Sequence, residues 1–178
     1  MSSTSSHSGG NVVESPELSK LRKICGYGHI FLILVTIFCT LLLALSIVAF
    51  CIFLVIDDPT IMDQDRHTMI ITMGTAVIDF AAFTTISYLL DRMIKTMKNG
   101  ESPFTNDNAH ILVHMATISV VSAVASIVGQ VVGIMVLNPE NYPGSIPFVQ
   151  IGGAIVLYSL ALIFGYGAQL QKESDETL

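Results

Sequence analysis

One acidic residue, Asp79, lies in the middle of a long apolar run, and three threonines share its helical face. Thr68, Thr72 and Thr75 fall within about 60° of it at 100° per residue. A carboxylate there must find donors, because a charge at the bilayer centre costs roughly 2.5–3.5 kcal/mol on insertion scales. Its chemistry would be proton or cation binding or ligand sensing. The structural alternative is a buried acid bonded to hydroxyls.

Depth in the membrane restricts the partners of Asp79. Hydroxyls near its level occur in each of the other apolar runs: Thr40, Ser46, Ser122, Ser126, Tyr158 and Ser159. We expect Tyr158 to be the donor, because it lies on a face of small residues. The predicted intramembrane polar site comprises Asp79, Thr72, Thr75, Tyr158, Ser122 and Ser126.

Four apolar runs must position these residues: 30–56, 68–90, 111–137 and 146–170. Each is about 23–27 residues long, enough to cross a hydrocarbon core of about 30 Å. Charged residues make up only 12% of the chain, against about 25% in soluble domains. The sequence therefore predicts an all-α membrane protein with four transmembrane helices.

Basic residues set the orientation, because Lys and Arg concentrate in cytoplasmic segments. Four crossings put seven of the eight on one side: Lys20, Arg22, Lys23, Arg92, Lys95, Lys98 and Lys172. Only Arg66 falls on the other side. We therefore expect an antiparallel four-helix bundle in the plasma membrane, with both termini cytoplasmic.

The predicted organisation has four parts. They are a disordered tail (1–14), a short basic juxtamembrane helix (15–29), the transmembrane bundle (30–170) and a polar tail (171–178). Gly26 and Gly28 are expected to loosen the join between the second and third parts.

Small residues indicate how the spans pack, because lipid supplies no hydrophobic drive for helix association. Ser122, Ser126, Gly129 and Gly133 share one face of the third run. A comparable stripe on the fourth run contains Ala154, Tyr158, Ala161, Gly165 and Ala168. We expect these faces to meet, with packing residues Gly129, Gly133, Ala161 and Gly165. The Gly129–Gly133 pair could instead join two copies of the chain in a homo-oligomer.

Catalytic chemistry has little support in the sequence. No nucleophile–base pair, phosphate-binding loop or Cys-x-x-Cys pair occurs. His110 and His114 have i, i+4 spacing, but no third metal ligand is evident nearby. We therefore expect no cofactor, no metal and no enzymatic activity.

The predicted cytoplasmic side carries a basic segment followed by a turn. Arg92, Lys95 and Lys98 would attract lipid headgroups or contact a partner. The candidate contact residues are Arg92, Lys95, Lys98, Phe104, Thr105 and Asn108. Thr105 or Asn106 is expected to cap the third helix, with Asp107 in its first turn.

Two segments carry a resemblance to a known family. Residues 98–108 read Lys-Asn-Gly-Glu-Ser-Pro-Phe-Thr-Asn-Asp-Asn, and residues 163–178 run from Ile-Phe-Gly-Tyr-Gly to Asp-Glu-Thr-Leu. Both resemble the small four-span bacterial membrane proteins grouped as domain of unknown function 2975, over about residues 20–178. The resemblance implies the same fold and a membrane location, but no activity. Such proteins are often encoded beside a helix-turn-helix regulator, which implies a transcription regulator as a cytosolic partner.

The leading functional hypothesis is a non-enzymatic regulatory or interaction protein with a cytoplasmic partner surface and no direct contact with nucleic acid. The alternative is a small transporter, or a proton or ion pathway, built on the stripe from Thr68 to Asp79.

Overall fold

The computed structural model describes residues 16–55, 63–98, 102–136 and 147–177. Its helices are α1 (Pro16–Val55), α2 (Asp63–Lys98), α3 (Asn106–Val136) and α4 (Phe148–Glu176). All four are long and apolar enough to cross a membrane. The prediction of an all-helical chain with four such helices is therefore confirmed. The tail predicted at 1–14 lies outside the described residues.

The predicted juxtamembrane helix and the first span form one continuous helix, α1, without a break at Gly26 or Gly28. A glycine inside a helix lowers stability by only about 1 kcal/mol relative to alanine, which the long helix tolerates. A Cβ atom added at Gly28 would lie 3.8 Å from Ile94 Cδ1 of α2. The expected loosening of this join is therefore not seen.

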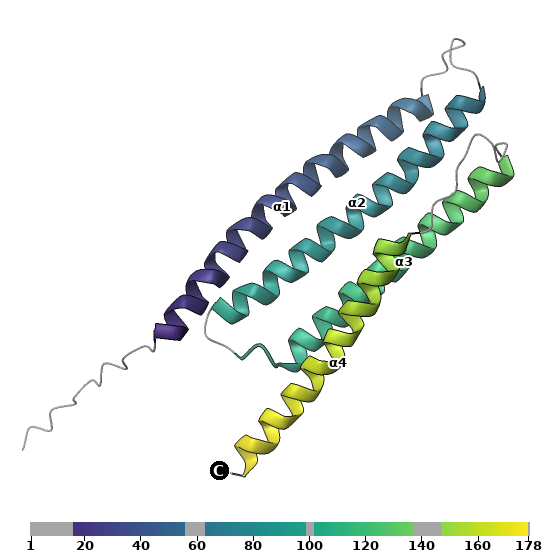
Figure 1. Cartoon of the computed structure of the whole chain (residues 1–178). Coiled ribbons are helices and arrows are strands. Elements are labelled where there is room, and N and C mark those ends of the chain that lie inside the picture. Colours follow the sequence, from purple (N-terminus) through teal and green to yellow (C-terminus); the bar gives the residue numbers. More distant parts are fainter. Residues whose placement is uncertain (1–15, 56–62, 99–101, 137–146, 178) are drawn as a thin grey trace, which may run out of the picture.

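The helices pack in the order in which they occur in the chain (Figure 1). α1 packs on α2, α2 on α3, and α3 on α4. Backbone contact between other helix pairs does not occur among the described residues. The start of α1 and the end of α4 lie toward the same end of the molecule (Figure 1). The arrangement is therefore an open row of helices, with α1 and α4 at its two edges.

α3 carries more buried side chains than any other described helix. Its buried residues recur every three or four positions, which is the period of a helix face. They include Asn108, Ile111, Leu112, Met115, Ala116, Ser119, Ser122, Ala123 and Ser126. Met115 and Asn108 are each only 1% exposed. α3 therefore forms the centre of the fold.

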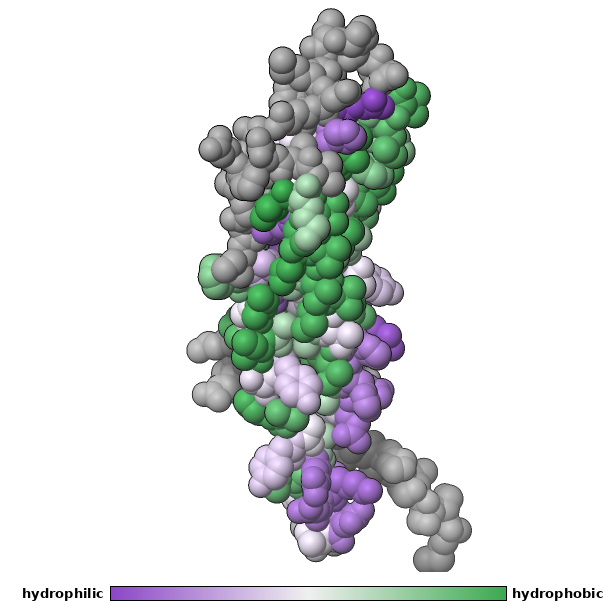
Figure 2. Space-filling model, turned by 90° about the vertical axis from the view of Figure 1, so that its right-hand side faces the viewer, coloured by the Kyte–Doolittle hydropathy of each residue, from purple (hydrophilic) through white to green (hydrophobic). Residues whose placement is uncertain are grey.

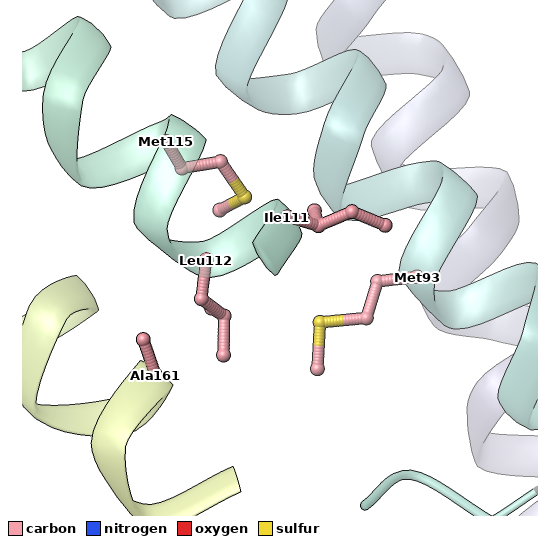
Figure 3. Packing of buried hydrophobic residues seen from close by; sticks show 5 residues of the cluster. All are labelled: Met93, Ile111, Leu112, Met115 and Ala161. Carbon is pink, nitrogen blue, oxygen red and sulfur yellow. The ribbon is translucent and has the colours of Figure 1, made fainter. Parts of the chain in front are cut away.

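Three helices share one apolar cluster near the start of α3 (Figure 3). Met93 comes from α2, Leu112 and Met115 from α3, and Ala161 from α4. Ile111 completes the buried set. This cluster draws α2, α3 and α4 together at one end of the molecule.

Hydrophobic side chains cover much of the middle of the molecule in Figure 2, and a large hydrophilic area lies at its lower end. Exposed hydrophobic residues occur on all four helices, including Phe31 of α1, Phe83 of α2, Val121 of α3 and Leu162 of α4. A surface of this kind suits a lipid environment, in which apolar side chains face acyl chains.

Leu112→Ala should lower the free energy of unfolding by about 2 kcal/mol, because it opens a cavity where three helices meet. Leu162→Ala, at a site 60% exposed, should change it little. Steric trapping in bicelles would measure both. Equal losses for the two variants would contradict a packed core at this position.

Candidate functional site

Two acidic side chains of α2 make the main polar contacts between helices. Asp79 and Asp91 are twelve residues apart, so they project about 120° apart around the helix axis. Asp79 meets α3, and Asp91 meets α1. α2 therefore binds a different neighbour through each carboxylate.

Asp79 accepts two hydrogen bonds from α3 on the same oxygen. The hydroxyl of Ser122 donates to Oδ1 at 2.6 Å, and that of Ser126 donates at 3.2 Å. Both serines are buried, with exposures of 3% and 7%. They are four residues apart and thus stack on one face of α3. The structure therefore brings together three members of the predicted polar site.

A close approach of α2 and α3 accompanies this contact. A Cβ atom added at Gly129 would lie only 2.5 Å from the Cγ2 methyl of Thr75. Glycine at this position lets the two helices come near enough for the serine hydroxyls to reach Asp79. Gly133, one turn further on, is also buried.

The small-residue face of α3 was expected to meet α4, and that expectation is wrong. Ser122, Ser126 and Gly129 contact α2 instead. The reason is that a carboxylate in an apolar medium needs donors, and this need outweighs the weaker preference of small residues for one another. On α4, Ala161 and Gly165 instead face the early part of α3, near Leu112 and Ala109.

Tyr158 was expected to donate to Asp79, and this too is wrong. Its side chain is 54% exposed, and α4 makes no backbone contact with α2 in the described part of the chain. Tyr158 lies on the outer side of α4, although Ala154 and Ala161 of the same predicted stripe are buried.

The other candidate hydroxyls bond within their own helices. Thr40 donates to the Thr36 carbonyl at 2.7 Å, Ser46 to Leu42 at 2.8 Å and Ser159 to Ile155 at 2.8 Å. Thr75 donates to the carbonyls of Ile71 and Thr72, and Thr72 is exposed. A helix carbonyl four residues back is always within reach of such a hydroxyl. Thr72 and Thr75 therefore do not donate to Asp79.

The second acidic site was missed by sequence reasoning. The Asp91 Oδ1 atom bonds to Nδ1 of His29 in α1, and its Oδ2 atom lies 2.9 Å from Nζ of Lys95. The side chain of Asp91 is 9% exposed and that of His29 is 16% exposed. The available signal was positional, since His29 immediately precedes one apolar run and Asp91 immediately follows the next.

The basic candidates divide into two kinds. Lys95 belongs to the Asp91 site, although its side chain remains 54% exposed. Arg92 and Lys98 are exposed on the surface of α2. Only these two are therefore available as simple surface contacts for a headgroup or a partner.

The turn before α3 is fixed by local hydrogen bonds. The side-chain amide of Asn108 donates to the Pro103 carbonyl at 2.9 Å, and its backbone N–H donates to Thr105 Oγ1 at 3.2 Å. Thr105 is thus the cap of α3, which decides between the two predicted capping residues. Asn108 is almost fully buried, so it holds the turn from inside.

The same turn lies against the end of α4. The ring of Phe104 sits 5.2 Å from that of Phe164, centroid to centroid. A Cβ atom added at Gly167 would lie 2.6 Å from Phe104 Cδ1, so glycine is needed for this approach. The hydroxyl of Ser102 donates to Gln171 Oε1 at 2.7 Å.

A groove of about 390 Å³ opens between this turn and the last turns of α4. Its lining combines aromatic, small, polar and charged side chains: Ser102, Phe104, Thr105, Asn106, Ala168, Gln171, Lys172, Asp175 and Glu176. We call it the terminal groove. Its lining includes the candidate contact residues Phe104 and Thr105. Asn108 is not part of the lining, but it holds the turn through its bonds to Pro103 and Thr105.

Metal binding has no geometric basis in the described parts of the four helices. They contain no group of three or more His, Cys, Asp or Glu side chains that could hold an ion. His110 and His114 are both exposed on α3.

Comparisons of the chain with family models, with curated proteins and with solved structures found no match. The membership implied by residues 98–108 and 163–178 remains a prediction.

Asp79→Asn should lower the free energy of unfolding by less than about 1 kcal/mol, because an amide oxygen still accepts from both serines. Asp79→Leu should lower it by about 1–2 kcal/mol. The double variant Asp79→Leu with Ser122→Ala should lower the free energy of unfolding by less than the sum of the two single losses. Additive effects in bicelle unfolding would show that the contact does not couple α2 to α3.

Asp91→Ala should loosen α1, because His29 and Lys95 both lose their carboxylate. We expect the free energy of unfolding to fall by about 1–3 kcal/mol. The Lys95 contact contributes little of this loss, because the Lys95 side chain is 54% exposed. Spin labels at Ile24 and Tyr88, both exposed, should show a broader distance distribution when the native cysteines are replaced by serine. The neighbouring Arg92→Ala is the control. Equal broadening in Arg92→Ala would show that Asp91 does not hold α1 in place.

Proposed function

We propose that this chain is a non-enzymatic membrane protein that acts by binding a cytosolic protein on its cytoplasmic face. The observation that carries the proposal is the terminal groove, which is built by a fixed turn against the end of α4. Binding surfaces of this kind usually lie on connecting segments held by a rigid scaffold.

The proposed topology places this groove in the cytoplasm. The four helices would cross the plasma membrane as an antiparallel bundle, with seven of the eight Lys and Arg residues on the side of the termini. The groove lies where the connection between α2 and α3 meets the end of α4, which is the same side.

A non-enzymatic role is supported by how the acidic groups are used. Asp79 is bonded to two serines, and Asp91 to a histidine and a lysine. The serine and histidine contacts join α2 to α3 and α1, whereas Lys95 lies within α2, so these carboxylates serve as structural ties. The family resemblance further implies that the partner is a transcription regulator of the helix-turn-helix class.

The alternative, a proton or ion pathway at Asp79, has weaker support. A shallow groove of about 280 Å³ between α2 and α3 includes Ser122 in its wall. Its other lining residues are mostly apolar: Ile78, Ala81, Ala82, Thr85, Thr117, Ile118 and Val121. Such a lining suits an acyl chain better than a hydrated ion. Equal proteoliposome flux for the chain and Asp79→Asn would dismiss the pathway.

Capture from native membranes tests the proposal. The full chain, tagged at its N-terminus, should recover a cytosolic protein after mild cross-linking. Changing Arg92 and Lys98 to Gln should reduce recovery by about fivefold, because two surface charges at about 0.5 kcal/mol each contribute about 1 kcal/mol together. Arg66→Gln, at the other end of α2, removes a like charge as the control. Failure of the intact chain to recover any cytosolic protein would refute the proposal.

A further inference from the structure

The terminal groove has two chemically distinct parts. Phe104, which is 42% exposed, and Ala168 supply apolar surface. Asp175 and Glu176 supply carboxylates from the last turns of α4. A ligand that fills this groove must therefore present an apolar group beside a charged or polar one.

The groove is held in place before any partner arrives. Ser102 bonds across it to Gln171, and Phe104 is fixed between Phe164 and Gly167. Side chains already ordered in the free protein lose little further entropy on binding. Even modest contacts can therefore yield measurable affinity here.

The charge of the groove is negative. Its lining contains two acids, Asp175 and Glu176, and one base, Lys172. The contact of Lys172 with Glu176 is long, at 3.8 Å, and both side chains are largely exposed, so it is weak. Asp175 is in no ion pair with the described residues, and the carboxylate of the nearby Glu173 accepts from the Gln169 amide at 3.1 Å. A cationic side chain is therefore favoured at this end of α4, and an anionic one is opposed.

The end of the helix strengthens this preference. The C-terminal end of a helix carries a partial negative charge, which basic residues normally offset. The last turn of α4 contains no basic residue, and it carries acidic ones instead. A bound cation would relieve repulsion already present in the free protein.

We propose that the terminal groove binds a basic, amphipathic segment of the cytosolic partner. An apolar side chain of that segment lies on Phe104 and Ala168, while a Lys or Arg lies beside Asp175 and Glu176. This inference rests on the proposed function and specifies the chemistry of its partner. A lipid headgroup is a poor occupant, because anionic headgroups carry the same sign of charge as the groove.

Peptide binding to the full chain in phosphatidylcholine nanodiscs tests the proposal, since a zwitterionic bilayer does not itself attract a basic probe. Two labelled peptides of equal length alternate Leu with Lys or Leu with Glu. Fluorescence anisotropy should show saturable binding of the Lys peptide, weakened by salt, and none of the Glu peptide.

Substitutions locate the binding. The double variant Asp175→Asn with Glu176→Gln should bind the Lys peptide about five- to tenfold more weakly. Both positions are exposed, so folding should be unaffected. Ala168→Leu should fill the apolar part and weaken binding further. Glu173→Gln is the matched control, because it removes an acid from the same helix outside the groove lining. It should change affinity less than twofold.

Three results would overturn the inference: equal binding of the Glu peptide, an equal effect of Glu173→Gln, or unchanged binding by both groove variants. The capture experiment separates this failure from failure of the proposed function. If Asp175→Asn with Glu176→Gln still recovers the partner fully, the function stands and the basic-segment proposal is wrong. If the Lys peptide binds as expected but the intact chain captures no cytosolic protein, the groove chemistry holds and the proposed function fails.

Discussion

A carboxylate packed between helices needs hydrogen-bond donors, and this need organises the described structure. α2 carries two such groups, and each finds its donors on a different neighbour. Asp79 draws α3 close through Ser122 and Ser126, while Asp91 draws α1 close through His29. Because these acids point about 120° apart, α2 lies between α1 and α3.

α4 is attached by a different kind of contact. It packs on α3 through small residues such as Ala161 and Gly165, and through the apolar cluster around Leu112. Near its end it also holds the turn before α3 through Phe104. The polar ties thus fix α1, α2 and α3, whereas the packing of α4 creates the terminal groove. Scaffold and proposed binding surface therefore depend on different interactions.

Sequence reasoning succeeded where one property decides the outcome. The apolar runs predict four long helices, and depth along the runs places Ser122 and Ser126 among the partners available to Asp79. It failed where several donors compete. Tyr158 shares a stripe with alanines, but a stripe of small residues does not reveal which neighbouring helix it faces, and Tyr158 is exposed. Thr40 and Ser46 lie at a suitable depth, yet each bonds to its own helix.

The pairing of Asp91 with His29 could not be predicted either, because sequence alone does not show which distant helices meet. Its contact with Lys95 is local and can be read from i, i+4 spacing, but its contact with His29 joins residues 62 positions apart. Length and apolarity by themselves predict four helices long and apolar enough to cross a membrane, because burying backbone in lipid requires complete internal hydrogen bonding. Only the tertiary structure decides which helix each acid meets and where the terminal groove opens, because those outcomes depend on helix rotation and closest approach between distant segments.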